Sequence, residues 1–164
     1  MQTKLISAAA LLLAATLSHA ADGKKAAASI PDNTPILMQA EVGSLDKRVE
    51  VAYVCDSQQG KRNVNAMYGI KDGETAVVQI KVGDQVTPGL WRVMNDTNGK
   101  KQNSYYGEGL TWITDKASPD TLTKANGKIL MQAGKLDGGL PKGDQTILFK
   151  DCKEDSAATK KLNK

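Results

Sequence analysis

The chain has few side chains of the types that most often do chemistry in proteins. Its two cysteines are Cys55 and Cys152, and its single histidine is His19. Histidine is the commonest general base near neutral pH and the commonest metal ligand. Because His19 lies in a segment typical of an export signal, we expect the exported chain to contain no histidine. This composition argues against an enzyme, and we expect neither a cofactor nor a bound metal.

Residues 1–20 have the pattern of a secretory signal peptide. Lys4 supplies the positive start, residues 5–17 are almost entirely apolar, and residues 18–20 form a small-x-small cleavage site. The apolar stretch is shorter than the roughly 20 residues that a transmembrane helix needs. We therefore expect export across the inner membrane of a Gram-negative bacterium, to the periplasm or the outer-membrane surface, with no transmembrane segment.

An oxidising compartment favours a disulfide between Cys55 and Cys152, because two cysteines allow a single intramolecular pairing. Two free thiols or an intermolecular bridge are the alternatives. The bridge would add about 4–5 kcal/mol of stability in the chain-entropy model, since it closes a long loop. The formal net charge of +4 is too small to predict a nucleic-acid-binding protein.

Hydrophobic residues alternate with polar ones along most of the chain, which is the period of β-strands. Between the strand-like segments lie turn signals such as Asn126-Gly127 and the glycine-rich stretch 134–143. About eight short strands joined by tight turns predict an all-β fold, a small antiparallel eight-stranded β-barrel, and a disulfide joining the first and last strands favours closure. The strand-like segments are 49–55, 64–70, 75–81, 85–87, 90–94, 104–106, 110–114, 121–123, 129–132 and 146–152.

The composition shifts at both ends of this patterned region. Residues 21–48 contain two prolines, an alanine run and a lysine pair, and we expect a flexible N-terminal leader. Residues 153–164 are charged and have almost nothing apolar, so we expect a disordered tail. The folded domain is therefore predicted to span 49–152.

The aromatic residues are few and close together in the sequence. Trp91 and Trp112 are expected in the core, each with a partner for its indole N–H. Tyr105 and Tyr106 are adjacent, so on a strand they face opposite ways and at least one should be available to a binding surface.

Charged and polar residues near these aromatics predict a rim at the ends of the strands. They form either a solvated hairpin or a cationic loop that enters an acidic cleft of another protein. The residues concerned are Lys100, Lys101, Glu108, Thr114, Asp115 and Lys116.

Several short motifs resemble those of the adhesin complex proteins of Gram-negative cocci and, more broadly, those of the periplasmic inhibitors of c-type lysozyme. They are residues 51–55 (VAYVC), 67–69 (MYG), 106–109 (YGEG) and 147–152 (ILFKDC). The resemblance covers about residues 49–152. It implies a compact eight-stranded barrel with a disulfide, and a function in blocking lysozyme or in attachment to host cells.

The resemblance also implies which residues contact lysozyme. In those inhibitors a lysine after a tryptophan-containing strand reaches the lysozyme active site, and Lys116 matches this lysine. A serine on a second loop matches Ser104, without the glycine that usually follows it. The expected lysozyme-binding residues are Lys116, Ser104, Tyr105, Tyr106, Glu108 and Asp115.

Three functions are therefore compared. The first is an exported inhibitor that occludes the active-site cleft of host c-type lysozyme, and the second is a surface adhesin that binds host cells. The third is a carrier of a small ligand inside the barrel. We rank it last because a barrel of about eight strands is just wide enough for side chains to fill its interior.

Overall fold

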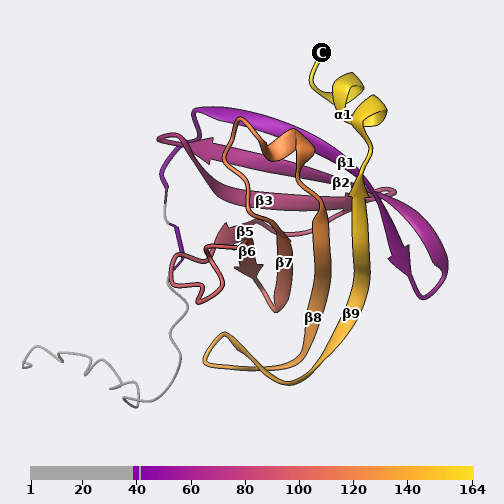
Figure 1. The fold of residues 1–164 in the computed structure, drawn as a ribbon. Coiled ribbons are helices and arrows are strands. Elements are labelled where there is room, and N and C mark those ends of the chain that lie inside the picture. The colour runs from indigo at the N-terminus through magenta and orange to yellow at the C-terminus, as the bar shows by residue number, and fades with distance from the viewer. Residues whose placement is uncertain (1–38, 41) are drawn as a thin grey trace, which may run out of the picture. The chain divides into compact units, whose positions relative to one another are not determined.

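Alternating apolar residues build the strands, and antiparallel pairing closes them into a barrel (Figure 1). The computed structural model describes residues 39–40 and 42–164, which lie within one compact unit spanning 35–164. The strands in this part of the chain are β1 (Lys47–Ser57), β2 (Gly60–Lys71), β3 (Glu74–Val82), β4 (Gln85–Val86), β5 (Leu90–Arg92), β6 (Gln102–Gly107), β7 (Leu110–Asp115), β8 (Gly127–Asp137) and β9 (Leu140–Glu154).

The strands pair in the order β2-β1-β9-β8-β7-β6-β5-β3, and β3 pairs again with β2. Eight strands thus form a closed ring, while β4 pairs only with β3. Closure leaves no free sheet edge around most of the ring. The predicted fold class, an eight-stranded antiparallel barrel, is confirmed.

Side chains at every second position fill the interior. Trp112 is completely buried, stacks edge-to-face on Tyr53 at 5.7 Å between ring centroids, and donates its indole N–H to the Tyr68 hydroxyl at 2.9 Å. The prediction of a buried Trp112 with a partner is confirmed. The same prediction was wrong for Trp91, which is half-buried on the outer wall. Leu90 takes the inward position on β5, so its neighbour faces outward.

A disulfide fastens the seam at which the barrel closes. β1 and β9 pair over a short ladder with a bulge, and at this bulge Cys55 bonds to Cys152, with the two Cα atoms 3.9 Å apart. Asp151 has φ of 49°, in the left-handed region, and this lets β9 accommodate its extra residue. The predicted disulfide between the first and last strands is confirmed.

The loop 116–126 closes one end of the barrel. Its residues Ala117, Leu122 and Ala125 belong to the hydrophobic core. Residues 121–123 were predicted as a strand, and this was wrong: Leu122–Lys124 form the short 3-10 helix η1. Hydrogen bonds between Ser118 and Thr121 fix a local turn, which directs Leu122 into the barrel.

At its opposite end the barrel interior opens into a cavity of about 780 Å³. This differs from the expectation that side chains would fill a barrel of this size. The turns at this end include 58–59, 83–84 and 108–109.

The glycine-rich stretch 134–143 was predicted as a long turn, but it continues two strands. β8 and β9 pair as far as Asp137 and Leu140, and the turn itself consists of Gly138 and Gly139. Both glycines have positive φ, 57° and 83°, as a two-residue hairpin turn requires.

The tail was predicted to be disordered, and for Ser156–Leu162 this was wrong, because they form helix α1. Asp155 caps the helix by accepting hydrogen bonds from two backbone N–H groups. β9 has ended at this point, so an edge of β1 is unpaired. Thr159 accepts from the Ala52 N–H, and Asn163 bonds both backbone groups of Glu50. The helix docks on the edge of β1 through hydrogen bonds and buries little apolar surface. The amino-acid composition of the tail therefore lacks the apolar residues that indicate an ordered segment.

The described part of the predicted leader contacts the barrel. Gln39 bridges to Val93, Ala40 donates its N–H to the Arg92 carbonyl, and Leu45 packs over Gly69. These residues therefore belong to the folded unit. The predicted signal peptide and the remainder of the leader lie outside the described residues. Within 39–40 and 42–164, no helix combines the length and apolarity required to cross a membrane.

Replacing Cys55 and Cys152 together by alanine should lower the free energy of unfolding by about 2–5 kcal/mol. The bond closes a loop with a sequence separation of 97 residues, and its loss raises the conformational entropy of the unfolded chain. Denaturant unfolding of the oxidised wild type and the double variant measures the difference. Equal unfolding midpoints would contradict the role given to this bond.

Gly127→Ala should destabilise the barrel by at least about 2 kcal/mol, through overpacking. An added Cβ would lie 2.2 Å from a Trp112 ring carbon and 2.9 Å from the Cys152 Cβ. Thermal unfolding measures the loss. Gly43→Ala is the matched control, since no atom lies within 4 Å of its added Cβ. A Gly127→Ala protein as stable as this control would refute the packing described here.

Candidate functional site

Four lysines gather at the closed end of the barrel, around the ends of β6, β7 and β8. At this end the last paired residues of β6 and β7 are Gln102 and Asp115. Lys101 precedes Gln102 and Lys116 follows Asp115, so the two lysines lie on neighbouring strand ends. We call this group the lysine rim: Lys100, Lys101, Lys116 and Lys128. The first three side chains are exposed, and Lys128 is half-buried.

Asp115 organises one side of the lysine rim. The Lys128 ammonium lies 3.7 Å from its carboxylate and donates to the Lys101 carbonyl at 3.4 Å. Asn126 donates to the same carboxylate at 3.4 Å. Lys116, the next residue, has no ion pair or side-chain hydrogen bond among the described residues. Its ammonium is thus available to a partner, whereas that of Lys128 is engaged.

Asp96 holds the loop that carries the other two lysines. Its carboxylate accepts hydrogen bonds from the Asn98 N–H at 2.8 Å, from Gln102 Nε2 at 3.2 Å and from the Ser104 hydroxyl. Partial burial acts to raise the pKa of Asp96, but these hydrogen bonds and the charge of Arg92 outweigh it and lower the pKa. Ser104 is nearly buried, with only 7% of its surface exposed, and its hydrogen bond to Asp96 ties the loop to β6.

The two tyrosines predicted as contact residues are both buried. Tyr105 points into the barrel, where its hydroxyl donates to Thr75 at 2.8 Å and the Arg92 guanidinium lies 5.5 Å from its ring centroid. Tyr106 lies on the outer wall, and its hydroxyl donates to the Gly139 carbonyl of the β8–β9 hairpin. Tyr105 has no exposed surface to offer to another protein, so it is left out of the proposed contact surface.

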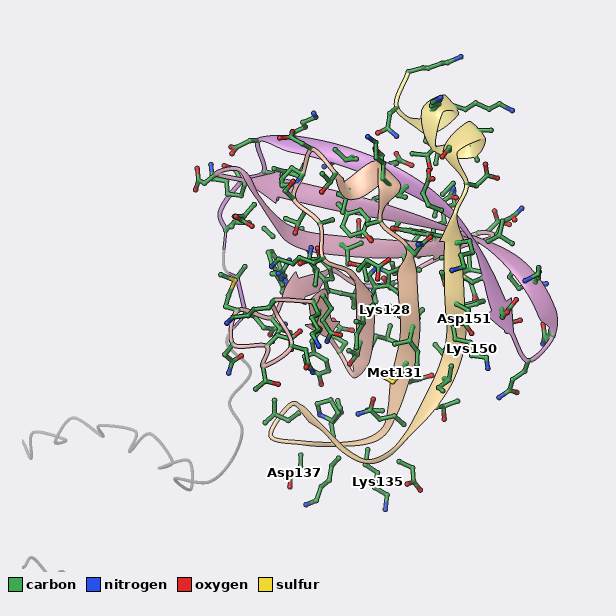
Figure 2. The ribbon with its side chains drawn as sticks, in the orientation of Figure 1. Lys128, Met131, Lys135, Asp137, Lys150 and Asp151 are labelled. Atoms are coloured by element: carbon green, nitrogen blue, oxygen red, sulfur yellow. A yellow bond between two sulfur atoms is a disulfide. The ribbon has the colours of Figure 1, made fainter. Side chains whose placement is uncertain are left out.

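Glu108 lies at the other end of the barrel from Lys116. It occupies the turn between β6 and β7, with φ of 47°, whereas Asp115 is the last residue of β7 at its far end and Lys116 follows it. Figure 2 shows the same separation along β8, with Lys128 near one end of the strand and Asp137 near the other. The structure therefore brings together Lys116 and Asp115, with Ser104 beneath the neighbouring loop, and it does not bring Glu108 to them.

Sequence reasoning missed Lys128 as a member of the rim and Asp96 as its support. Lys128 follows Gly127, which was read as part of a turn but begins β8. An aspartate whose carboxylate accepts a hydrogen bond from the backbone N–H two residues later is a local turn signal. Asp96 and Asn98 form such a pair. In the described part of the chain, no three His, Cys, Asp or Glu side chains lie close enough to hold a metal ion.

Ser104→Ala should raise the pKa of Asp96 toward its ordinary value and lower the free energy of unfolding near pH 7 by about 1–2 kcal/mol. Because the folded state lowers this pKa, the stabilisation is present at neutral pH and is lost as the pH falls through the folded pKa. The wild type and the variant should therefore converge in strong acid. NMR titration of the Asp96 carboxyl and denaturant unfolding measure both effects. Ser44→Ala, at an exposed serine, is the control, and an unmoved Asp96 pKa in Ser104→Ala would exclude the proposed support.

Comparison with known proteins identifies the family of this chain. Residues 49–154 match the family model described as Nm-ACP, ACP-like domain. A solved structure, the adhesin complex protein from Neisseria meningitidis, is 23% identical, and the match covers 65% of this chain and 99% of that chain with a TM-score of 0.48. No curated protein sequence matches this chain. The resemblance to lysozyme inhibitors stays a prediction. Because the family model covers more than half of the sequence, the chain belongs to the ACP-like domain family.

Proposed function

We propose that this protein is an exported inhibitor of c-type lysozyme, which binds the enzyme through the lysine rim and occludes its active-site cleft. The observation that carries the proposal is the exposed, unpaired ammonium of Lys116 at the position that matches the inhibitory lysine of known inhibitors. The protein itself performs no catalysis in this proposal, and it requires no cofactor.

The chemistry of the target explains why a lysine would inhibit it. Lysozyme cleaves its substrate with one carboxyl group that must be protonated and one that must be ionised. An ammonium placed between them forms charge-assisted hydrogen bonds in a cleft shielded from water. A positive charge at that position also lowers the pKa of the general acid, so the acid loses the proton that it must donate.

The barrel gives Lys116 a defined position. Asp115 is the last residue of β7 and pairs with Gln102 across the sheet, so the backbone that carries Lys116 is fixed. On its other side, Ala117 is buried and its carbonyl accepts from Asn103 at 2.7 Å. A lysine between two anchored residues loses less freedom on binding than one on a flexible loop, and this favours affinity.

Net charge does not favour this encounter, because lysozymes of this class are basic and this chain has a formal net charge of +4. Local acidic side chains near the closed end offset the repulsion. Asp120 and Glu74 are exposed at this end and form no ion pair among the described residues. They would contact basic side chains at the margin of the lysozyme cleft.

Lys116→Ala should raise the inhibition constant for c-type lysozyme by a factor of roughly 5–150, the range that corresponds to about 1–3 kcal/mol for a buried interface residue. Inhibition is followed by the clearing of a cell-wall suspension in the presence of purified protein. Lys81→Ala is the control, because Lys81 is an exposed lysine at the opposite end of the barrel. It should inhibit as the wild type does.

Two results would count against this proposal. If the wild type in micromolar excess leaves lysozyme fully active, inhibition is excluded. If the wild type inhibits but Lys116→Ala and Lys81→Ala inhibit equally well, a different surface is responsible.

Adhesion to host cells is the second candidate function, and membership of the ACP-like family favours it. Met94 is 63% exposed on the loop beside the lysine rim, and an apolar side chain next to cations suits contact with a protein surface. We propose an outer-membrane or periplasmic location for either function. Binding of labelled protein to whole host cells, with retained binding after lysozyme is removed, would favour adhesion.

A further inference from the structure

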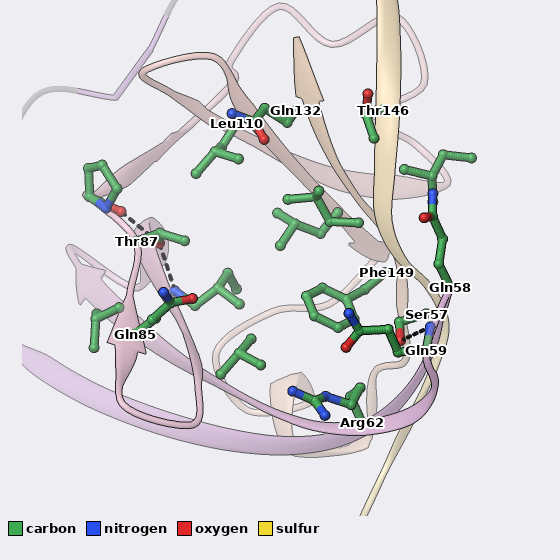
Figure 3. A pocket seen from close by; sticks show the side chains of 17 residues that line it. Ser57, Gln58, Gln59, Arg62, Gln85, Thr87, Leu110, Gln132, Thr146 and Phe149 are labelled. Carbon is green, nitrogen blue, oxygen red and sulfur yellow. Dashed lines mark hydrogen bonds between the residues drawn. The ribbon is translucent and has the colours of Figure 1, made fainter. Parts of the chain in front are cut away.

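The cavity at the open end of the barrel is the strongest feature that the lysine rim does not explain. It has a volume of about 780 Å³, within the range of about 300–1,000 Å³ that is typical of small-molecule sites. Figure 3 looks into it and shows Gln85 and Thr87 on one side, and Phe149, Ser57 and Gln59 on the other. The cavity is continuous with the barrel interior, since Ile80 and Leu130 of the core line it.

The wall of the cavity is apolar and partly exposed. Four hydrophobic residues pack against the core while remaining partly exposed, and all four line this cavity: Val82, Leu110, Leu148 and Phe149. Leu148 and Phe149 are consecutive, so a regular strand would turn one of them outward. The β8–β9 register shifts between Leu130 and Met131, and this bulge leaves Leu148 as the extra residue beside the cavity. The fold thus leaves apolar surface exposed to solvent, and a bound ligand would cover this surface.

The mouth of the cavity carries a single charge. Arg62 is the only ionisable residue among the described residues that line it. It is exposed and lies two residues before Val64 on β2, in phase with the buried Val64, Ala66 and Tyr68, so it continues the row of inward-facing residues to the mouth of the barrel. No ion pair or side-chain hydrogen bond of Arg62 occurs among the described residues, whereas the adjacent Lys61 pairs with Asp56.

The other polar groups at the mouth are neutral donors. Four glutamines surround it, and their amide N–H groups can donate alongside the guanidinium: Gln58, Gln59, Gln85 and Gln132. No aspartate or glutamate of the described chain lines the cavity. An anionic head group would therefore find donors and a cation at the mouth and no like charge. A cationic head group would find no counter-ion.

We propose that this cavity binds a single-chain fatty carboxylate, with the carboxylate at Arg62 and the alkyl chain against Val82, Leu110 and Phe149. Guanidinium and carboxylate match in a bidentate geometry, which favours this head group. The alkyl chain would cover the apolar wall that is otherwise exposed to water. The site lies at the end of the barrel opposite to the lysine rim, so this proposal does not depend on lysozyme inhibition.

Calorimetric titration of the folded, disulfide-bonded protein with octanoate, decanoate and dodecanoate tests the proposal. Each added methylene should tighten binding by about fourfold while the chain still fits, the fold-change that corresponds to about 0.8 kcal/mol per buried methylene. Arg62→Gln should weaken decanoate binding by roughly tenfold or more, as expected for loss of a charge-assisted contact. The same variant should leave the binding of decanol, which has no charge, unchanged.

Two further variants separate head-group recognition from general effects. Arg48→Gln removes an exposed arginine that does not line the cavity, and it should bind decanoate as the wild type does. Thr146→Trp places a large side chain at an exposed lining position and should abolish binding of both decanoate and decanol. Thermal unfolding shows whether each variant is folded.

Three results would overturn the proposal. They are the absence of saturable decanoate binding, equal decanoate affinity in wild type and Arg62→Gln, and NMR shifts on adding decanoate that fall on the lysine rim instead of Leu110 and Leu148. Binding to anionic phospholipid vesicles with no response to free decanoate counts as the first of these results, and it would exclude a site for a free fatty carboxylate.

Discussion

The closure of the barrel between β1 and β9 is the constraint on which the other features depend. The ladder between these strands is short and contains a bulge, so hydrogen bonds alone hold the seam weakly. The disulfide from Cys55 to Cys152 crosses it at the bulge, and the segment after β9 continues along the edge of β1 as helix α1. Without this seam the ring would open into a curved sheet with two free edges. Neither the rim at one end nor the cavity at the other would then have a defined shape.

The two ends of the barrel differ because different groups occupy them. At the closed end Trp112, Tyr53 and Tyr68 form a hydrogen-bonded cluster, and burial raises the pKa values of both tyrosine hydroxyls. The loop 116–126 adds Leu122 to the same hydrophobic core. At the open end, Gln85 and Val86 of the short strand β4 line the mouth of the cavity. The closed end therefore carries exposed charged side chains, and the open end leaves apolar side chains partly exposed.

Most of the fold could be predicted from the sequence, because the inner wall of a barrel repeats at every second residue. Val51, Tyr53 and Cys55 show this period, and the structure buries all three. The failures have a common physical cause, which is structure fixed by contacts between distant residues. Helix α1 depends on the backbone of β1, and η1 depends on the space that Leu122 fills. In the candidate site, Lys116 and Asp115 could be found from the sequence, but the burial of Tyr105 and the support of Asp96 by Ser104 depend on which face of β6 is inside.

The cavity shows why counting strands does not determine the interior volume of a barrel. Eight strands leave space that large side chains can fill, and the aromatic members of the core cluster, Tyr53, Tyr68, Tyr105 and Trp112, lie in one part of the core. The mouth is lined instead by aliphatic residues, neutral amides, hydroxyl side chains and Arg62, and Phe149 is the one aromatic residue of the described chain that lines it. An arginine in phase with core residues is costly unless water or an anion reaches it. The position of Arg62 therefore requires an open end, and an open end beside apolar walls is the arrangement in which an amphiphile with an anionic head satisfies both kinds of surface at once.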